Sequence, residues 1–188
     1  MSPILGIWAS QNYPRITSSY ESIATVTVGS GGTSTITFSS IPSTYKHLQI
    51  RYSGHLEGNA NDYASLWMQF NSDTGANYSY HRLYGTGSAA SSDAATSQTR
   101  ALTTWIPDNA TQSLSYGASV IDILDYQNTN KYKTIRDLGG FDLNGSGIVA
   151  LFSGLWMSTS AISSISLVSS QSQDFAEYSK FALYGIKG

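Results

Sequence analysis

The sequence predicts an all-β protein: a two-sheet antiparallel β-sandwich, jelly-roll-like, with an extended N-terminal arm. Two observations carry this prediction. Short segments alternate apolar and polar side chains with a period of two, and clusters of Gly, Asn, Asp, Pro and Ser separate them at regular spacing. No segment shows a sustained apolar period of about 3.6 residues with capping residues at its ends, so we expect no helix longer than a turn or two. Many short strands at regular spacing are typical of sandwiches and jelly rolls.

The first predicted strands lie in the opening third of the chain. Residues 22–28 and 33–39 alternate in character around a glycine-rich turn at 29–32. This arrangement predicts a β-hairpin, because glycine allows the positive φ that such turns require. Residues 47–53 form a third expected strand, whose apolar side chains share one face: Leu48, Ile50 and Tyr52.

The middle of the chain holds two further strands and a long connection. Residues 64–70 and 78–84 are expected strands on either side of a turn at 71–75. Residues 85–99 contain no large apolar side chain, and we expect them to form a long exposed loop. The second half continues the strand pattern, with expected strands at 101–106, 115–126, 131–141, 148–157, 162–169 and 178–187.

The predicted strand at 148–157 is apolar on both faces. In a small sandwich such a strand lies centrally, under a loop or at a subunit contact. Interfaces between subunits avoid charge at their centres, and this chain has few charges to place there. The segment therefore favours an oligomer.

Residues 1–20 fall outside the repeating strand pattern, and we separate them from a sandwich domain at 21–188. A segment this short cannot form its own core, so its apolar side chains must pack on the domain or on a neighbour. The two interpretations are an N-terminal edge strand and a docking arm. The candidate docking residues are Ile4, Leu5, Ile7, Trp8 and Tyr13.

The composition agrees with a β-rich domain coated in hydroxyl groups. The chain has 188 residues, enough for one domain with a core of its own. Charged residues make up 12% of the chain, against a usual share of about 25%. The 32 serines and 17 threonines take over the polar role.

Charge and hydropathy exclude several classes of function. The net charge is −2 and the cationic residues are scattered, so no basic stripe is available to bind nucleic acid. No apolar run is long enough to span a membrane, and the first residues lack the basic start of a signal peptide. The absence of cysteine excludes a disulfide framework and agrees with synthesis in a cytoplasm.

The sequence contains no enzyme signature, and we expect no catalytic residue and no cofactor. A glycosidase would need two facing carboxylates, but Asp122 and Asp125 are three residues apart and so point to opposite faces of a strand. No GxSxG motif is present, and the three histidines share no metal-ligand spacing. We therefore expect no metal.

One segment leaves a calcium ion open. Asn71, Asp73 and Asn77 place oxygen atoms at alternate positions, as the start of a calcium loop does. Arg82 stands where the bidentate glutamate of such a loop is required. An Asx-rich β-turn explains the same residues without an ion.

Aromatic residues are the remaining candidates for a binding surface. Tyr78, Tyr80, Tyr84 and Trp105, with neighbouring Asn and Asp, are of the kind that stack on sugar rings. The three tyrosines share one parity along their strand, which is compatible with a core face or with a glycan-binding face.

Four segments of the chain resemble a known module. Residues 20–51, 70–84, 121–134 and 181–187 are similar, in this order, to small β-sandwich modules in virion proteins of tailed bacteriophages. The resemblance covers roughly residues 20 to 188. It implies a structural module displayed on the virion, either as head decoration or in tail fibres and tips, and it brings no catalytic residues with it.

We therefore expect a bacteriophage virion structural protein, synthesised in the bacterial cytoplasm and located in the virion. It would oligomerise, as a trimer, and its N-terminal arm would anchor it to capsid or tail proteins, as a head decoration (cement) protein or a tail fibre. The alternative is a carbohydrate-binding receptor-recognition module that binds a host surface glycan. We expect neither nucleic acid nor membrane as a partner.

Overall fold

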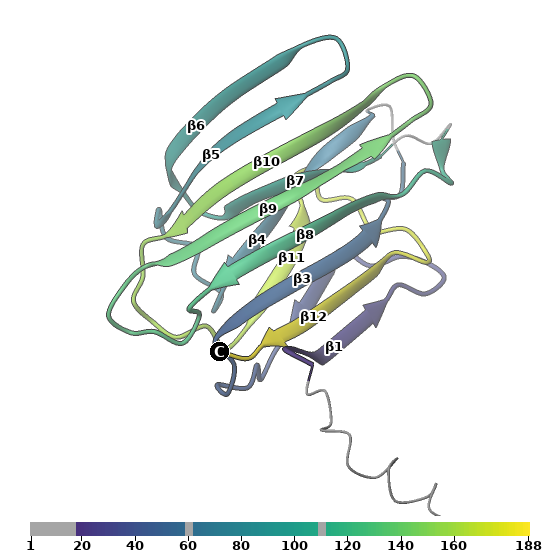
Figure 1. The fold of residues 1–188 in the computed structure, drawn as a ribbon. Helices are drawn as coiled ribbons and strands as arrows, with labels where there is room; N and C mark the ends of the chain where they lie inside the picture. The colour runs from purple at the N-terminus through teal and green to yellow at the C-terminus, as the bar shows by residue number, and fades with distance from the viewer. Residues whose placement is uncertain (1–17, 59–61, 109–111) are drawn as a thin grey trace, which may run out of the picture.

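The predicted two-sheet antiparallel sandwich is confirmed by the computed structural model, which describes residues 18–58, 62–108 and 112–188 (Figure 1). The large sheet has the order β1 (Tyr20–Thr27), β12 (Lys180–Ile186), β3 (His47–Gly54), β8 (Gly117–Leu124), β9 (Lys133–Asp142), β10 (Gly147–Trp156), β5 (Tyr78–Gly85) and β6 (Ala90–Gln98). The small sheet has the order β2 (Thr35–Phe38), β11 (Ile165–Ser169), β4 (Tyr63–Phe70) and β7 (Ala101–Pro107). The jelly-roll connectivity stays a prediction.

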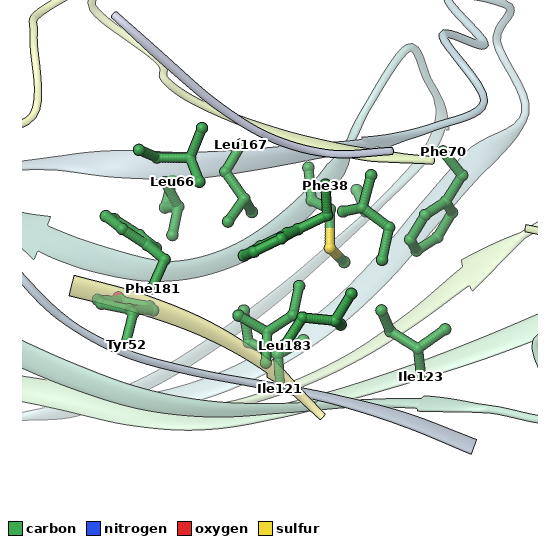
Figure 2. Packing of buried hydrophobic residues seen from close by; sticks show 14 of the residues in the cluster. Phe38, Tyr52, Leu66, Phe70, Ile121, Ile123, Leu167, Phe181 and Leu183 are labelled. Carbon is green, nitrogen blue, oxygen red and sulfur yellow. The ribbon is translucent and has the colours of Figure 1, made fainter. Parts of the chain in front are cut away.

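The main core lies between the two sheets and follows the period-two pattern of the sequence. As expected, Leu48, Ile50 and Tyr52 of β3 are buried on one face, while Arg51 between them is exposed. Figure 2 shows how side chains of the two sheets interdigitate, those of the small sheet being Phe38, Leu66, Phe70 and Leu167, and those of the large sheet Ile121, Ile123, Phe181 and Leu183.

The hairpin expected at 22–39 is wrong. β1 pairs with β12 in the large sheet, whereas β2 pairs with β11 in the small sheet. The glycine-rich turn between them carries the chain from one sheet to the other, with Gly31 and Gly32 at φ of 92° and 70°. Alternation identifies strands correctly, but it does not identify their partners.

The exposed loop expected at 85–99 is also wrong, because residues 90–98 form β6 at the edge of the large sheet. β6 pairs with β5, and most of its residues are exposed. The strand lacks large apolar side chains because neither of its faces is covered. Its backbone ladder holds it in place, together with Arg82, which donates to both carboxylate oxygens of Asp93 at 2.6 and 2.5 Å.

β7 packs against four strands of the large sheet, β5, β8, β9 and β10, and every residue of β7 is buried. Ala101 and Ile106 of β7 belong to the main core. Leu102 and Trp105 form a second cluster with side chains of the large sheet, namely Ile148, Ala150 and Phe152, and with Tyr80 and Tyr84 packed around them. Residues 148–157, predicted to be apolar on both faces, form most of β10. Contact with β7 accounts for the apolar side chains on the inner face of β10.

Close approach of neighbouring strands requires glycine where β9 runs between β8 and β10. A Cβ on Gly140 would lie 2.3 Å from the carbonyl oxygen of Ile148, and one on Gly139 would lie 2.6 Å from the Cβ of Ser119. Both obstacles are on the adjacent strands themselves. No side chain fits between these strands without separating them.

We therefore expect Gly140→Ala to destabilise the fold by about 1–3 kcal/mol, as overpacking does. The measurement is urea unfolding followed by tryptophan fluorescence. Gly29→Ala is the matched control, because no atom lies within 4 Å of a Cβ placed there. Equal urea midpoints for the two variants would contradict the close-approach argument.

Candidate functional site

Tyr78, one of the four residues expected to bind a glycan, is a core residue. Its side chain is fully buried, and its hydroxyl accepts a hydrogen bond from the backbone N–H of Phe70 at 3.1 Å. The same hydroxyl donates to the carbonyl of Asp73 at 3.3 Å. Burial raises the pKa of Tyr78 to about 12. Of the two interpretations left open for Tyr78, a core face and a glycan-binding face, its burial supports the core face.

The other three predicted residues, Tyr80, Tyr84 and Trp105, are brought together, but around an arginine. The guanidinium carbon of Arg82 lies 4.5 Å from the ring centre of Trp105. It lies 5.4 Å from that of Tyr84 and 5.6 Å from that of Tyr80. A cation held on aromatic faces in this way is stabilised by the ring quadrupoles. Arg82 therefore covers the faces that a sugar was expected to stack on.

Burial completes this correction of the aromatic platform. Trp105 is 7% exposed, and the Arg82 side chain is 15% exposed. The sequence places Arg82 on the same face of β5 as Tyr80 and Tyr84, because the three residues are spaced two apart along the strand. Tyr80 and Tyr84 are half-buried, so the three aromatic residues surround Arg82 and do not form an open platform, although Tyr80 also borders a cleft.

A cleft lies beside this cluster, where the β5–β6 hairpin meets β4 and the start of β7. Its volume is about 270 Å³. Neither aspartate nor glutamate lines it, whereas two arginines do. The lining residues are Ser65, Trp67, Tyr80, Arg82, Gln98, Thr99, Arg100 and Leu102.

Two β-bulges border the cleft. In β6, Thr96 and Ser97 lie opposite Ser79 of β5, and Ser97 adopts a φ of 56°. In β7, Thr103 and Thr104 lie opposite Leu66 of β4. Bulges redirect the side chains next to them, and they are frequent beside functional sites.

Asp137 supplies the buried hydrogen bonds that the β7 bulge needs. The carboxylate is fully buried and accepts hydrogen bonds from the backbone N–H of Thr104 and from the hydroxyl of Ser119. The carbonyl of Leu66, on the other side of the bulge, accepts from the hydroxyl of Thr103 at 2.9 Å. Because an unpaired backbone group in the core is costly, these side chains make the bulge possible.

A second surface feature is an exposed row of apolar side chains on the outer face of the large sheet. Leu83, Leu151, Leu138 and Val120 lie directly opposite one another across β5, β10, β9 and β8. They are 56%, 46%, 58% and 40% exposed. Val149, 62% exposed, lies beside the row. We call these five residues the outer apolar row.

Charged side chains border the outer apolar row at Arg136, Asp122 and Arg51. Arg136 and Asp122, one step along the strands from Leu138 and Val120, form an ion pair at 3.4 Å. Arg51, directly opposite Val120, stacks on the ring of Tyr184 at 5.1 Å and donates to Gln49, but it pairs with no carboxylate of the described residues. The face is therefore apolar in the middle, with the cation of Arg51 at the Val120 end of the row.

Hydrogen bonds within the protein hold together the turn at 71–77, which the sequence left as either a calcium loop or an Asx-rich turn. The carboxylate of Asp73 accepts from Trp156 Nε1 at 2.7 Å, from the backbone N–H of Gly75 at 2.8 Å and from Asn77 Nδ2 at 3.0 Å. Burial raises the pKa of Asp73, but these hydrogen bonds outweigh it and leave the pKa below its usual value. Donors surround both oxygens, which supports the Asx-turn interpretation over an ion.

The candidate docking residues of the N-terminal arm are not among the residues that the structure describes. Ile4, Leu5, Ile7, Trp8 and Tyr13 lie outside the described residues, while Tyr20, placed in the arm from the sequence, belongs to β1. In the described ranges, no cluster of three or more His, Asp or Glu side chains could hold a metal ion. The same ranges contain no helix with the length and apolar character needed to cross a membrane.

Comparison with protein-family models, with curated proteins and with solved structures gave no match.

The buried Asp137 makes stability depend on pH. Burial raises the pKa of its carboxyl to about 7, and Asp122 adds to this effect, while the hydrogen bonds from Ser119 and Thr104 oppose it. The folded chain thus holds this proton more tightly than the unfolded chain, whose aspartates titrate near pH 4. The contribution of Asp137 to stability is therefore greatest below about pH 4 and is lost as the pH rises to about 7.

We expect Asp137→Asn to remove this pH dependence, because the amide still accepts from Thr104 and carries no charge. The difference in unfolding free energy between wild type and variant should change by up to about 1.4 kcal/mol per pH unit between pH 5 and 7. Urea unfolding at several pH values measures it. Asp137→Ala, which leaves the Thr104 N–H unpaired, should cost about 1–3 kcal/mol. Parallel pH profiles for wild type and Asp137→Asn would contradict this account.

Proposed function

We propose that this chain is a structural module of a tailed-bacteriophage virion, which assembles with copies of itself through the outer apolar row. The single observation that supports self-assembly is the row itself. Exposed apolar side chains scattered singly are ordinary, but a contiguous set indicates a contact surface. Here four side chains align across four strands at the centre of a sheet face.

A second copy of the chain is the partner that best suits this face. The centre of the row has no charge, and interfaces avoid charge at their centres. Arg136 and Asp122 beside the row form an ion pair within the chain, so neither needs a partner from another molecule. Arg51, at the Val120 end of the row, lies at its border and not at its centre. The net charge of −2 adds little repulsion between copies. The proposed oligomer is a trimer.

The virion location is supported by the resemblance of four sequence segments to phage β-sandwich modules. Residues 1–20 would anchor the oligomer to capsid or tail proteins, since many symmetric copies multiply weak contacts. The module would then serve as head decoration or as part of a tail fibre. The alternative, a carbohydrate-binding receptor-recognition module, now depends on the cleft beside Arg100, because Arg82 covers the aromatic platform.

The self-assembly proposal predicts that a charge in the outer apolar row dissociates the oligomer. The wild-type chain should elute as a trimer in size-exclusion chromatography with light scattering, and Leu151→Glu should elute as a monomer. Leu114→Glu is the matched control, because Leu114 is 92% exposed and lies outside the row. Both side chains are exposed, so the thermal midpoints of the two variants should stay close together. A monomeric wild type, or a trimeric Leu151→Glu, would refute the proposed interface.

The anchoring proposal predicts a separate defect. A chain lacking residues 1–16 should fold and form the same oligomer, because the described strands begin at Tyr20. It should no longer co-purify with virion particles during infection, whereas the full chain and Leu114→Glu should. Incorporation of the truncated chain at the level of the full chain would refute the anchor.

A further inference from the structure

We infer that the cleft between the β5–β6 hairpin and the β4–β7 pair binds an acidic sugar, with Arg100 as the ligand of its carboxylate. This site is distinct from the outer apolar row. The cleft lies at the junction of the two sheets, and the row lies on the outer face of the large sheet. The inference goes beyond the proposed structural role, and either one can fail alone.

Arg100 forms no ion pair within the part of the chain that the structure describes. Its Nε is buried and has no hydrogen-bond acceptor among the residues that the structure describes. Arg82 and Arg136, in the large sheet, pair with Asp93 and Asp122. Arg51, also in the large sheet, pairs with no carboxylate of the described residues, but its Nε donates to Gln49. A buried guanidinium N–H without an acceptor is unfavourable, and a bound carboxylate would satisfy it.

Trp67 holds the Arg100 guanidinium in position. The guanidinium carbon lies 4.8 Å from the Trp67 ring centre. Stacking on an aromatic face fixes the plane of the guanidinium group and directs its N–H groups sideways. Such an edge matches the two oxygens of a carboxylate in a bidentate pair.

The charge balance of the cleft favours an anion. Arg82 and Arg100 both line it, and no carboxylate does. Asp93 neutralises Arg82 by a bidentate hydrogen bond, so the uncompensated charge is that of Arg100. One free positive charge selects a ligand with one negative charge.

The remaining walls of the cleft suit a sugar ring. Ser65, Gln98 and Thr99 offer hydroxyl and amide groups for ring hydroxyls, while Tyr80 offers an apolar surface. Gln98 Nε2 donates to the carbonyl of Thr96 at 2.9 Å, which orients the amide. The volume of about 270 Å³ is close to the lower limit of roughly 300 Å³ for ligand pockets, so it admits one ring and not a long chain.

The backbone around the cleft is held in an unusual conformation. Ser97 at φ 56° is a non-glycine residue in the left-handed region, a backbone conformation that is unfavourable for a residue with a side chain. It directly precedes Gln98 and Thr99, two of the lining residues. The bulge therefore sets the positions of these polar groups before any ligand arrives, which lowers the entropic cost of binding.

The test is calorimetric titration of the full oligomer with three probes: glucuronate, methyl glucoside and acetate. Glucuronate has both ring and carboxylate, methyl glucoside has the ring alone, and acetate has the carboxylate alone. We expect glucuronate to bind with a dissociation constant in the millimolar range, and each of the other two to bind at least about tenfold more weakly.

The variants assign the binding to Arg100. Arg100→Gln should weaken glucuronate binding by about tenfold or more, and Arg100→Lys should restore it in part, because lysine keeps the charge but loses the planar fork. Arg136→Gln, which removes an arginine from the outer face, is the matched control and should bind as wild type does. Thermal unfolding of each variant verifies that it is folded.

Several outcomes would overturn the inference. They are the absence of glucuronate binding at roughly 10 mM, equal binding of methyl glucoside, equal binding of acetate, and unchanged binding by folded Arg100→Gln. Leu151→Glu separates the two proposals. We expect this variant to bind glucuronate as wild type does, since Leu151 does not line the cleft. If the oligomer fails to form, glucuronate binding is still expected. If glucuronate does not bind, the oligomer is still expected to form.

Discussion

The fold depends on a hydrogen bond between the two sheets, from the backbone N–H of Thr104 to the carboxylate of Asp137. β7 carries a bulge in a fully buried position, and the bulge leaves a backbone donor without a strand partner. Asp137 reaches it from β9 of the large sheet. The price is a buried carboxyl with a raised pKa. Because this side chain is present, β7 is completely buried and the N–H of Thr104 still has a hydrogen-bond acceptor.

The position of β7 in turn determines where both candidate surfaces lie. Because the large sheet passes beyond β7, the inner side chains of β10 and β5 pack on Leu102 and Trp105, and the β5–β6 hairpin extends past the small sheet. The cleft beside Arg100 lies under this extension. Among the described residues, no layer covers the outer face of the same strands, and this face carries the outer apolar row. Packing on the inner face of the large sheet therefore accounts for the cleft beside Arg100, and the uncovered outer face of the described strands accounts for the outer apolar row.

The sequence was sufficient for strand identity and insufficient for strand partners. Alternation of side chains placed eleven of the twelve strands and the buried face of β3, because burial on one face imposes the period of two directly. β6 was missed because a strand with both faces in water needs no apolar side chains. The separation of β1 from β2 was missed because a glycine turn serves a hairpin and a crossing between sheets equally well.

For the candidate sites too, the sequence pattern does not show which side chains meet in space. Parity grouped Tyr80 and Tyr84 correctly, but the sequence did not reveal that Arg82, on the same face, occupies their rings. Arg100 and Trp67 are 33 positions apart and meet only through the pairing of β4 with β7. Such a site follows from tertiary structure, because no local pattern links its members. β6 has one further consequence. It ends the large sheet with a free edge, where Asp93 and the kink at Ser97 interrupt a flat row of donors and acceptors. A charged and kinked edge of this kind opposes the side-by-side addition of strands from neighbouring molecules, the route by which sheets grow into fibres.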